Sequence, residues 1–419
     1  MATESRHPAS WLQQSIYDSS PGAQSTLSVP LGVRLLGALD IDRLTAALNS
    51  VMERHEALRT RLESSESGLW QVVSDDFQPI HLFRQRIDPG AVMDVCRSEF
   101  ARPFDLHGSL LRFQLYQIGQ HDHLLTMAAD HTIMDGFSAQ VIVGELAMHY
   151  AGEFPDPPAL QYRDYAAWER QEIHPGTLEY WTTRLSPAGS RLRLGMTPQS
   201  LQEELQTELF QLPEVPHDDI VRTARRWRVP VIAVLGAIML ASLCGYQTDQ
   251  VAAGLFTGNR DRPGLETTVG FVADLMPVPL PAGQGQDLAD LASGFAAVLE
   301  ECQEHRAPLR AVRGLLNPQA GRPLFDVSLN YLPPLSCIDK TISAGGLSFS
   351  AELLEFLYPT RLTHGWYDGA AFLDYRWRVR DGRLMGYLAA NGPRVLASAA
   401  REIAERTRKL VCTAITQCD

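Results

Sequence analysis

Residues 130–138 read DHTIMDGFS and place a histidine between two carboxylates, close to a glycine and a serine. An imidazole titrates near neutrality, so His131 could act as a general base. In an extended strand Asp130 would point away from His131, whereas Asp135 could fold back beneath it. Gly136 would permit a tight turn, and Ser138 could cap a following helix. Taken alone, the pattern also fits a structural or solvated pairing of histidine and aspartate.

The hydrophobic pattern on both sides predicts the elements that would hold this segment. Residues 111–118 (LRFQLYQI) alternate apolar and polar side chains, as a half-buried strand does. Residues 119–122 (GQHD) predict a turn, and residues 123–130 (HLLTMAAD) predict a second, more buried strand. Residues 137–150 predict a helix. A strand, a short loop and a helix would therefore meet at residues 130–138, and such loops often carry function.

The rest of the chain predicts a mixed α/β protein with two halves. Residues 30–62 predict a strand and then a helix that begins after Asp40, a suitable N-cap. One apolar face of that helix would hold Leu44, Leu48, Val51, Met52 and His55. Helices are also expected from residue 161 and over 393–411, and a strand over 382–389. Residues 153–160 predict a connector, and residues 186–200 a linker.

Composition narrows the class of protein. The 419 residues carry a net charge of −12, which argues against a nucleic-acid-binding surface. The six cysteines form no CxxC pair and no zinc-type cluster, so we expect reduced thiols, no metal and a cytoplasmic location. The N-terminus does not read as a signal peptide. Residues 229–246 are apolar enough to raise a membrane span as an alternative, but a helix buried in the protein is the preferred interpretation.

Several further segments carry a resemblance to a known family. DHTIMDG resembles the HHxxxDG motif of the condensation domains of nonribosomal peptide synthetases. RHEALRT (54–60) resembles the RHExLRT signature of the same family, and YRDYAAW (162–168) resembles its YxDYAxW element. GLFTGNRDRPGLETTVGF (254–271) and PLFDVSLNY (323–331) are similar to two later elements, in the family's order.

This resemblance implies an architecture. Condensation domains consist of two lobes that each resemble chloramphenicol acetyltransferase, arranged in a V with the active-site tunnel between them. The fold class expected from the resemblance is thus α/β (α+β). We place the N-terminal lobe, with the DHxxxDG motif, at residues 1–178 and the C-terminal lobe at residues 179–419.

The resemblance also assigns catalytic and supporting roles. His131 matches the catalytically important second histidine, which accepts the proton of the nucleophile or positions the nucleophile. Asp135 matches the motif aspartate, which is chiefly structural and pairs with an arginine. Arg260 is the expected partner, with Arg262 as the alternative. Gly136 would let its backbone approach the acyl carbonyl.

Three further residues are candidates for substrate binding. Asp130 replaces the first histidine of the family's motif, and its carboxylate could raise the basicity of His131 or shape the choice of acceptor. Asn330 matches an asparagine that the resemblance places at the tunnel, and a hydrogen bond within the sheet is the alternative interpretation. Together with Ser138, Asp130 and Asp135 also form a DxxxxDxxS pattern, which resembles the heterocyclisation branch.

The function implied is an acyl transfer in natural-product biosynthesis. An acyl or aminoacyl group would arrive as a thioester on the phosphopantetheine arm of a carrier protein acting in trans, or on coenzyme A. An amine, or an alcohol, would attack it to form an amide or an ester, without a permanently bound cofactor, a nucleic acid or a membrane. We expect a monomer. The alternatives are a heterocyclisation variant, a coenzyme A-dependent O-acyltransferase and a non-catalytic module that docks carrier proteins or recruits another enzyme.

Overall fold

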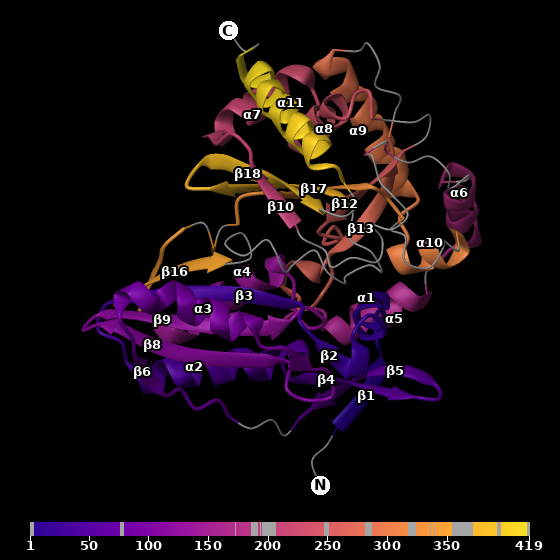
Figure 1. The fold of residues 1–419 in the computed structure, drawn as a ribbon. Helices are drawn as coiled ribbons and strands as arrows, with labels where there is room; N and C mark the ends of the chain where they lie inside the picture. The colour runs from indigo at the N-terminus through magenta and orange to yellow at the C-terminus, as the bar shows by residue number, and fades with distance from the viewer. Residues whose placement is uncertain are drawn as a thin grey trace. The chain divides into compact units, whose positions relative to one another are not determined.

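The computed structural model divides the chain into two compact units, and each unit is drawn from several segments (Figure 1). Unit 1 comprises Met1–Glu172, Gly258–Ala273 and Leu335–Trp366. Unit 2 comprises Ile173–Thr257, Asp274–Pro334 and Tyr367–Asp419. The structure describes residues 4–75, 79–171, 173–185, 192, 194, 207–246, 251–280, 287–316, 324–335, 337–338, 340–353, 372–391 and 395–416.

A mixed sheet forms the centre of unit 1. Its strands follow the order β15 (Ile342–Ala344), β16 (Leu347–Leu353), β3 (Ser28–Leu36), β9 (Asp122–Asp130), β8 (Leu111–Gly119) and β6 (Arg84–Arg86). The predicted hairpin is confirmed, since β8 and β9 are antiparallel and Gly119 lies opposite Asp122. All but the first residue of β9 are buried, as its continuous apolar run predicts. Strand β16, orange in Figure 1, pairs with β3 although more than 300 residues separate them in the sequence.

Helices pack on this sheet. The predicted helix after Asp40 is α2 (Ile41–Arg54), and the Asp40 side chain accepts the backbone N–H of Arg43 as an N-cap. Helix α4 (Gly136–Ala151) packs against α2 and contacts β3, β15 and β16. Helix α3 (Val92–Ala101) contacts β3 and β9. The short elements of this part are η1 (Pro21–Ala23), β2 (Gln24–Ser25), η3 (Pro89–Ala91) and β7 (Phe104–Asp105).

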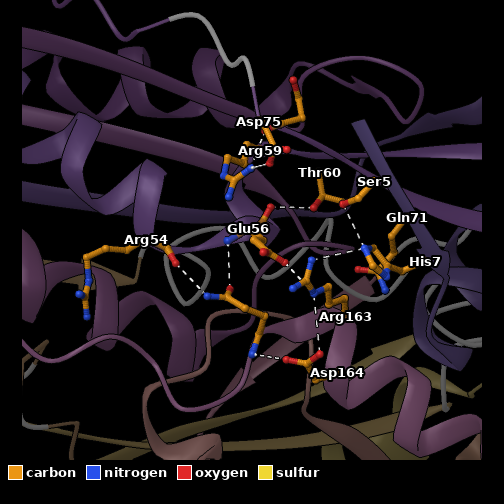
Figure 2. A network of polar contacts seen from close by, with 12 residues as sticks. Ser5, His7, Arg54, Glu56, Arg59, Thr60, Gln71, Asp75, Arg163 and Asp164 are labelled. Carbon is orange, nitrogen blue, oxygen red and sulfur yellow. Dashed lines mark hydrogen bonds and ion pairs between the residues drawn. The ribbon is translucent and has the colours of Figure 1, made fainter. Parts of the chain in front are cut away.

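A second, smaller sheet of unit 1 holds the N-terminal strand. Its order is β1 (Glu4–Pro8), β5 (Gly68–Ser74) and β4 (Thr60–Ser65). Helix α5 (Tyr162–Gln171) and the turn η2 (Glu56–Arg59) contact this sheet, and helix α1 (Trp11–Asp18) packs against α5. Figure 2 shows the polar network that joins η2 and α5 to this sheet: Arg163 lies 3.2 Å from Glu56 and 3.5 Å from His7. The RHEALRT and YRDYAAW segments are therefore in direct contact.

Unit 2 is built on a mixed sheet covered by helices. Its order is β10 (Thr207–Gln211), β18 (Arg383–Asn391), β17 (Leu373–Arg380), β14 (Val327–Leu332), β12 (Ala252–Thr257) and β13 (Asp274–Pro279), and β11 (Val215–Pro216) also pairs with β18. The helices are α6 (Pro175–Leu185), α7 (His217–Trp227), α8 (Val231–Ser242), α9 (Leu288–Glu304), α10 (Leu309–Leu316) and α11 (Ala397–Thr416). Helix α8 packs against α7, α9 and α11.

The apolar segment 229–246 forms the core helix of unit 2. Helix α8 has 12 residues, and every residue from Ala233 to Leu240 is buried. It is too short for a membrane span, which needs about 20 residues. Within the described part of the chain, no helix is both long and apolar enough to cross a membrane.

The compact units differ from two continuous halves. The predicted boundary between residues 178 and 179 lies near the point where unit 1 ends and Ile173 begins unit 2. However, residues 258–273 and 335–366, which the sequence places in the second half, belong to unit 1. Segment 258–273 contains Arg260 and the turn η5 (Leu265–Thr267). The predicted linker, residues 186–200, lies outside the described residues apart from Leu192 and Leu194.

Candidate active site

His131 directly follows the last residue of β9 and is 4% exposed. Its backbone N–H donates to the carbonyl of Leu27 at 2.8 Å, and that of Asp130 donates to the carbonyl of Leu110. These bonds continue the pairing of the sheet past the end of the strand. The aromatic ring of Phe271 lies against the imidazole, with the ring centroids 4.3 Å apart.

Burial controls the charge of His131. Loss of hydration lowers the pKa of the imidazole to about 3, although the carboxylate of Asp135 and backbone hydrogen bonds with His131 itself and Met134 act to raise it. The ring is therefore uncharged at neutral pH, and in this form one of its two nitrogens is a hydrogen-bond acceptor.

Asp135 is the N-cap of α4 and uses both carboxylate oxygens. Oδ1 accepts the backbone N–H of Ser138 at 2.7 Å, and Oδ2 accepts the N–H groups of Val272 and Ala273 at 3.1 Å each. Burial acts to raise the pKa of Asp135, but the Arg260 guanidinium and these hydrogen bonds outweigh it, so the pKa lies below its ordinary value. Asp135 thus stays ionised and ties the start of α4 to segment 258–273.

Arg260 is the arginine that pairs with Asp135, as expected. Its Nη2 lies 2.8 Å from Asp135 Oδ1, and its side chain is 6% exposed. The guanidinium also lies over the ring of Phe137, 4.5 Å from its centroid. The alternative partner, Arg262, instead lies over the ring of Trp168 and is exposed. We name this cluster of Asp135, Arg260 and Ser138 the latch.

Ser138 completes the latch and does not cap α4. Its Oγ lies 2.7 Å from Asp135 Oδ1 and 2.8 Å from the carbonyl of Gly270, and it accepts the N–H of Gly270 and a guanidinium N–H of Arg260. One hydroxyl has a single proton to donate and two lone pairs, so this environment uses its capacity fully. The expectation that Ser138 caps the helix is wrong, because Asp135 does so. A substrate-binding role gains no support from this geometry.

Asp130 forms hydrogen bonds within the loop, whereas Asp135 is the carboxylate that raises the pKa of His131. It is fully buried, and its Oδ1 accepts the N–H of Thr132 at 2.9 Å and the hydroxyl of Thr132 at 2.6 Å. Burial raises the pKa of Asp130, against hydrogen bonds from Ser25 and Thr132 and the charge of Arg112. Asp130 is not among the groups that act on the pKa of His131, so its predicted effect on the basicity of His131 is not seen.

Comparison with known proteins now identifies the family. Residues 4–350 match the condensation domain family. The chain belongs to the condensation domain family. A stretch of 284 residues is 29% identical to part of the cyclosporin synthetase of Tolypocladium inflatum, covering 63% of this chain and 2% of that protein. The chain therefore corresponds to a small fraction of the length of this relative.

Solved structures share the same α/β fold. The X-domain in its complex with OxyB from teicoplanin biosynthesis superposes with a TM-score of 0.77 at 19% identity, covering 99% of this chain and 96% of the X-domain. The starter condensation domain of rhizomide synthetase, in complex with C8-CoA, also gives 0.77 at 19% identity, covering 99% and 95%. The expected fold class of a condensation domain is confirmed.

Two predicted site residues of this condensation domain remain candidates. Gly136 is the first residue of α4 and is half-buried, next to Asp135 in the chain. Asn330 lies in β14 of unit 2, half-buried and opposite Arg376 of β17. His131 belongs to unit 1, so contact of Asn330 with the same substrate stays a prediction.

Sequence reasoning missed residues that hold the loop of the condensation motif. The side chain of Gln13 donates to the carbonyl of Thr132, and the hydroxyl of Tyr162 donates to the carbonyl of Phe271. The spacing of Ser10 and Gln13 is a signal for a capping box at the start of α1, and that box is present. Nothing in the spacing indicates that Gln13 also reaches residue 132.

The part of the chain that the structure describes contains no candidate metal site and no disulfide bond. Its residues contain no group of three or more His, Cys, Asp or Glu side chains that could hold a metal ion. Cys96, Cys244, Cys302, Cys337 and Cys412 are free thiols.

Proposed function

We propose that this condensation domain transfers an acyl or aminoacyl group from a carrier-protein thioester to an amine and so forms an amide. The observation that carries the proposal is an uncharged, buried His131 that packs against Phe271 and stands where the family has its second motif histidine. The phosphopantetheine arm of a carrier protein, or coenzyme A, would supply the thioester. The starter condensation domain of rhizomide synthetase in its complex with C8-CoA supports coenzyme A as a second donor.

The reaction needs no covalent enzyme intermediate. The acceptor nitrogen attacks the thioester carbonyl, the C–N bond forms and the C–S bond breaks. The proton lost by nitrogen passes through His131 to the departing thiolate, which leaves as a thiol. Because a thioester is already activated, positioning of the two substrates contributes much of the rate.

The low pKa of His131 favours an amine over an alcohol. An imidazole with a pKa of about 3 is a weak base, so it suits a hydrogen bond to the nucleophile followed by late proton transfer. An attacking amine becomes strongly acidic once its nitrogen is bonded to carbon, and a weak base then suffices. An alcohol loses its proton during the attack and depends more on the strength of the base. We therefore place ester formation second.

The first test follows turnover directly. The purified protein is offered carrier-protein and coenzyme A thioesters of varied acyl groups, with amine and alcohol acceptors, and products are identified by mass spectrometry. We expect amide from the wild type and a loss of about 10²- to 10⁴-fold in His131→Ala, the usual contribution of a general base. Equal rates for the two proteins would remove His131 from the chemistry.

A recruitment module is the second candidate function. The structurally similar X-domain has been solved in a complex with OxyB, a second protein. This candidate predicts tight binding of a carrier protein or a partner enzyme without turnover of any thioester. Amide formed by the wild type and lost in His131→Ala would exclude it as the sole function.

A further inference from the structure

Two buried side chains outside the DHTIMDG motif act on the loop that carries His131. Gln13 of α1 donates its Nε2–H to the carbonyl of Thr132 at 3.0 Å, and Tyr162 of α5 donates its hydroxyl to the carbonyl of Phe271 at 3.0 Å. Thr132 follows His131 in the chain, and the Phe271 ring packs against the imidazole. We infer that Gln13 and Tyr162 are positioning residues that set the orientation of His131 for acyl transfer, an inference that rests on the proposed function.

The orientation of the Gln13 amide is fixed because its oxygen faces a hydrogen-bond donor and its nitrogen faces an acceptor. Its Oε1 accepts the backbone N–H of Ser10 at 2.9 Å, which leaves the NH₂ group facing the Thr132 carbonyl. The N–H and the hydroxyl of Thr132 are both bound by Asp130. All three polar groups of Thr132 are thus engaged. Because the N–H of His131 is also bound, the backbone on both sides of the imidazole has little freedom to rotate.

The hydroxyl of Tyr162 lies in a directed chain of hydrogen bonds. A carbonyl can only accept, so Tyr162 donates to Phe271 and therefore accepts from the hydroxyl of Ser10, 2.8 Å away. Its ring packs on Gly270, where an added Cβ would lie 2.3 Å from a ring carbon. Ser138 of the latch binds the N–H and the carbonyl of the same Gly270. Residues 270 and 271 are thus held by the latch and by Tyr162.

Helices α1 and α5, which carry Gln13 and Tyr162, are themselves held in place by hydrogen bonds and an ion pair. At the start of α5, the side chain of Gln161 accepts the N–H of Glu56, and Glu56 pairs with Arg163 (Figure 2). Further along α5, Glu169 accepts the N–H of Trp11 at the start of α1. The network in Figure 2 thus holds the start of α5, which carries Tyr162, and the Glu169 hydrogen bond holds the start of α1, which carries Gln13. A shift of about 1 Å in a reacting group is enough to slow an enzyme strongly.

Two substitutions each remove one hydrogen bond to the His131 surroundings, together with one to Ser10, and keep the side-chain volume close to the original. Tyr162→Phe deletes the hydroxyl, and Gln13→Met deletes the amide. Tyr165→Phe is the matched control, because Tyr165 lies in the same helix, is also buried, and directs its hydroxyl to Glu169 at 3.4 Å. Melting temperatures are measured for all three variants, so that rates are compared only between folded proteins.

The test combines steady-state kinetics with an NMR signal of the His131 ring, assigned by its absence from His131→Ala. We expect Tyr162→Phe and Gln13→Met to lower kcat by about tenfold with KM changed less than twofold, and to move or broaden the ring signal. Tyr165→Phe should change neither. If the ring signal and kcat of Tyr162→Phe and Gln13→Met match those of Tyr165→Phe, the two side chains serve stability alone and the inference is overturned. If Tyr162→Phe and Gln13→Met move the ring signal while the wild type itself transfers no acyl group, the positioning is supported and the proposed function is rejected, so the two failures are distinguishable.

Discussion

At the scale of single residues, His131 couples the chemistry of the site to the stability of the protein. Its pKa in the folded protein is about 3, whereas an imidazole in an unfolded chain titrates near 6.5. Below pH 6.5 the unfolded chain binds a proton that the folded protein does not. Stability from His131 is thus complete above pH 6.5 and decreases as the pH falls towards 3.

This difference predicts a measurable slope. From pH 6.5 to 5.0 the wild type should lose about 1.6 kcal/mol of unfolding free energy through His131, with a slope that rises from about 0.7 to about 1.4 kcal/mol per pH unit. His131→Gln should lack this part of the slope. Urea denaturation at pH 7.5, 6.5, 5.5 and 5.0 measures it. An unchanged slope in His131→Gln would contradict the low pKa of His131.

The sequence predicted which residues form the candidate site better than it predicted what each of them binds. The order DHTIMDG with a later arginine indicated His131, Asp135 and Arg260, and the pair forms. The tasks of Asp130 and Ser138 could not be predicted, because short polar side chains bind whichever backbone group lies nearest after folding. Both remain candidates for substrate contact, and in the structure they bind backbone groups of Thr132 and Gly270.

At the scale of elements, the latch joins two segments that are distant in sequence. Asp135 at the start of α4 binds Arg260 and the backbone of Val272 and Ala273, across more than 120 residues of chain. Removal of one partner from a buried ion pair leaves an uncompensated charge, which is costly. The latch should therefore be among the most sensitive contacts of unit 1.

Arg260→Met tests the latch. Loss of the guanidinium should lower the free energy of unfolding by about 3 kcal/mol or more, because the Asp135 carboxylate stays buried without its counter-charge. Arg262→Met is the matched control, since Arg262 is exposed and contacts the Trp168 ring, a contact of about 1 kcal/mol or less. Urea unfolding of both variants measures the difference. Equal losses would show that Arg260 stabilises the loop no more than an exposed arginine does.

The elements around the motif were predictable because their signals are local. The alternation in β8, the apolar run of β9 and the Asp40 cap of α2 lie in the residues concerned. The support from α1 and α5 was not predictable. Gln13 and Thr132 are 119 residues apart, and no periodicity links a side chain to a backbone carbonyl at such a distance.

At the scale of the whole molecule, the chain returns to units that it has already left. Segment 258–273 leaves the sheet of unit 2 after β12 and comes back at β13, and β16 joins the first sheet late in the chain. Hydrophobic patterns identify strands but not their partners, so a division at one boundary was the simplest prediction. The resemblance to the family still covered most of the inserted segment, because GLFTGNRDRPGLETTVGF includes its residues 258–271.

Two glycines lie in contacting helices of unit 2 but differ in the space available for a larger side chain. Gly236 lies within α8, and an added Cβ would lie 2.4 Å from the ring of Phe295 on α9. Gly294 lies within α9, and an added Cβ would meet nothing within 4 Å. The sequence shows a glycine inside a helix in both cases. The difference is visible only in the structure, where the Phe295 ring lies against Gly236 and no atom lies near a Cβ added at Gly294.

Substitution by alanine should therefore change the stability of the protein in opposite directions at these two positions. Gly236→Ala should destabilise the protein by about 1–3 kcal/mol, because the fully buried Phe295 ring would have to move in a close-packed core. Gly294→Ala should stabilise it by about 0.5–1 kcal/mol, since alanine loses less backbone entropy in a helix. Thermal and urea unfolding of the two variants give the sign directly. A stabilising Gly236→Ala would mean that α8 and α9 pack less closely than the structure has them, and the helix interior would then tolerate larger residues than glycine at both positions.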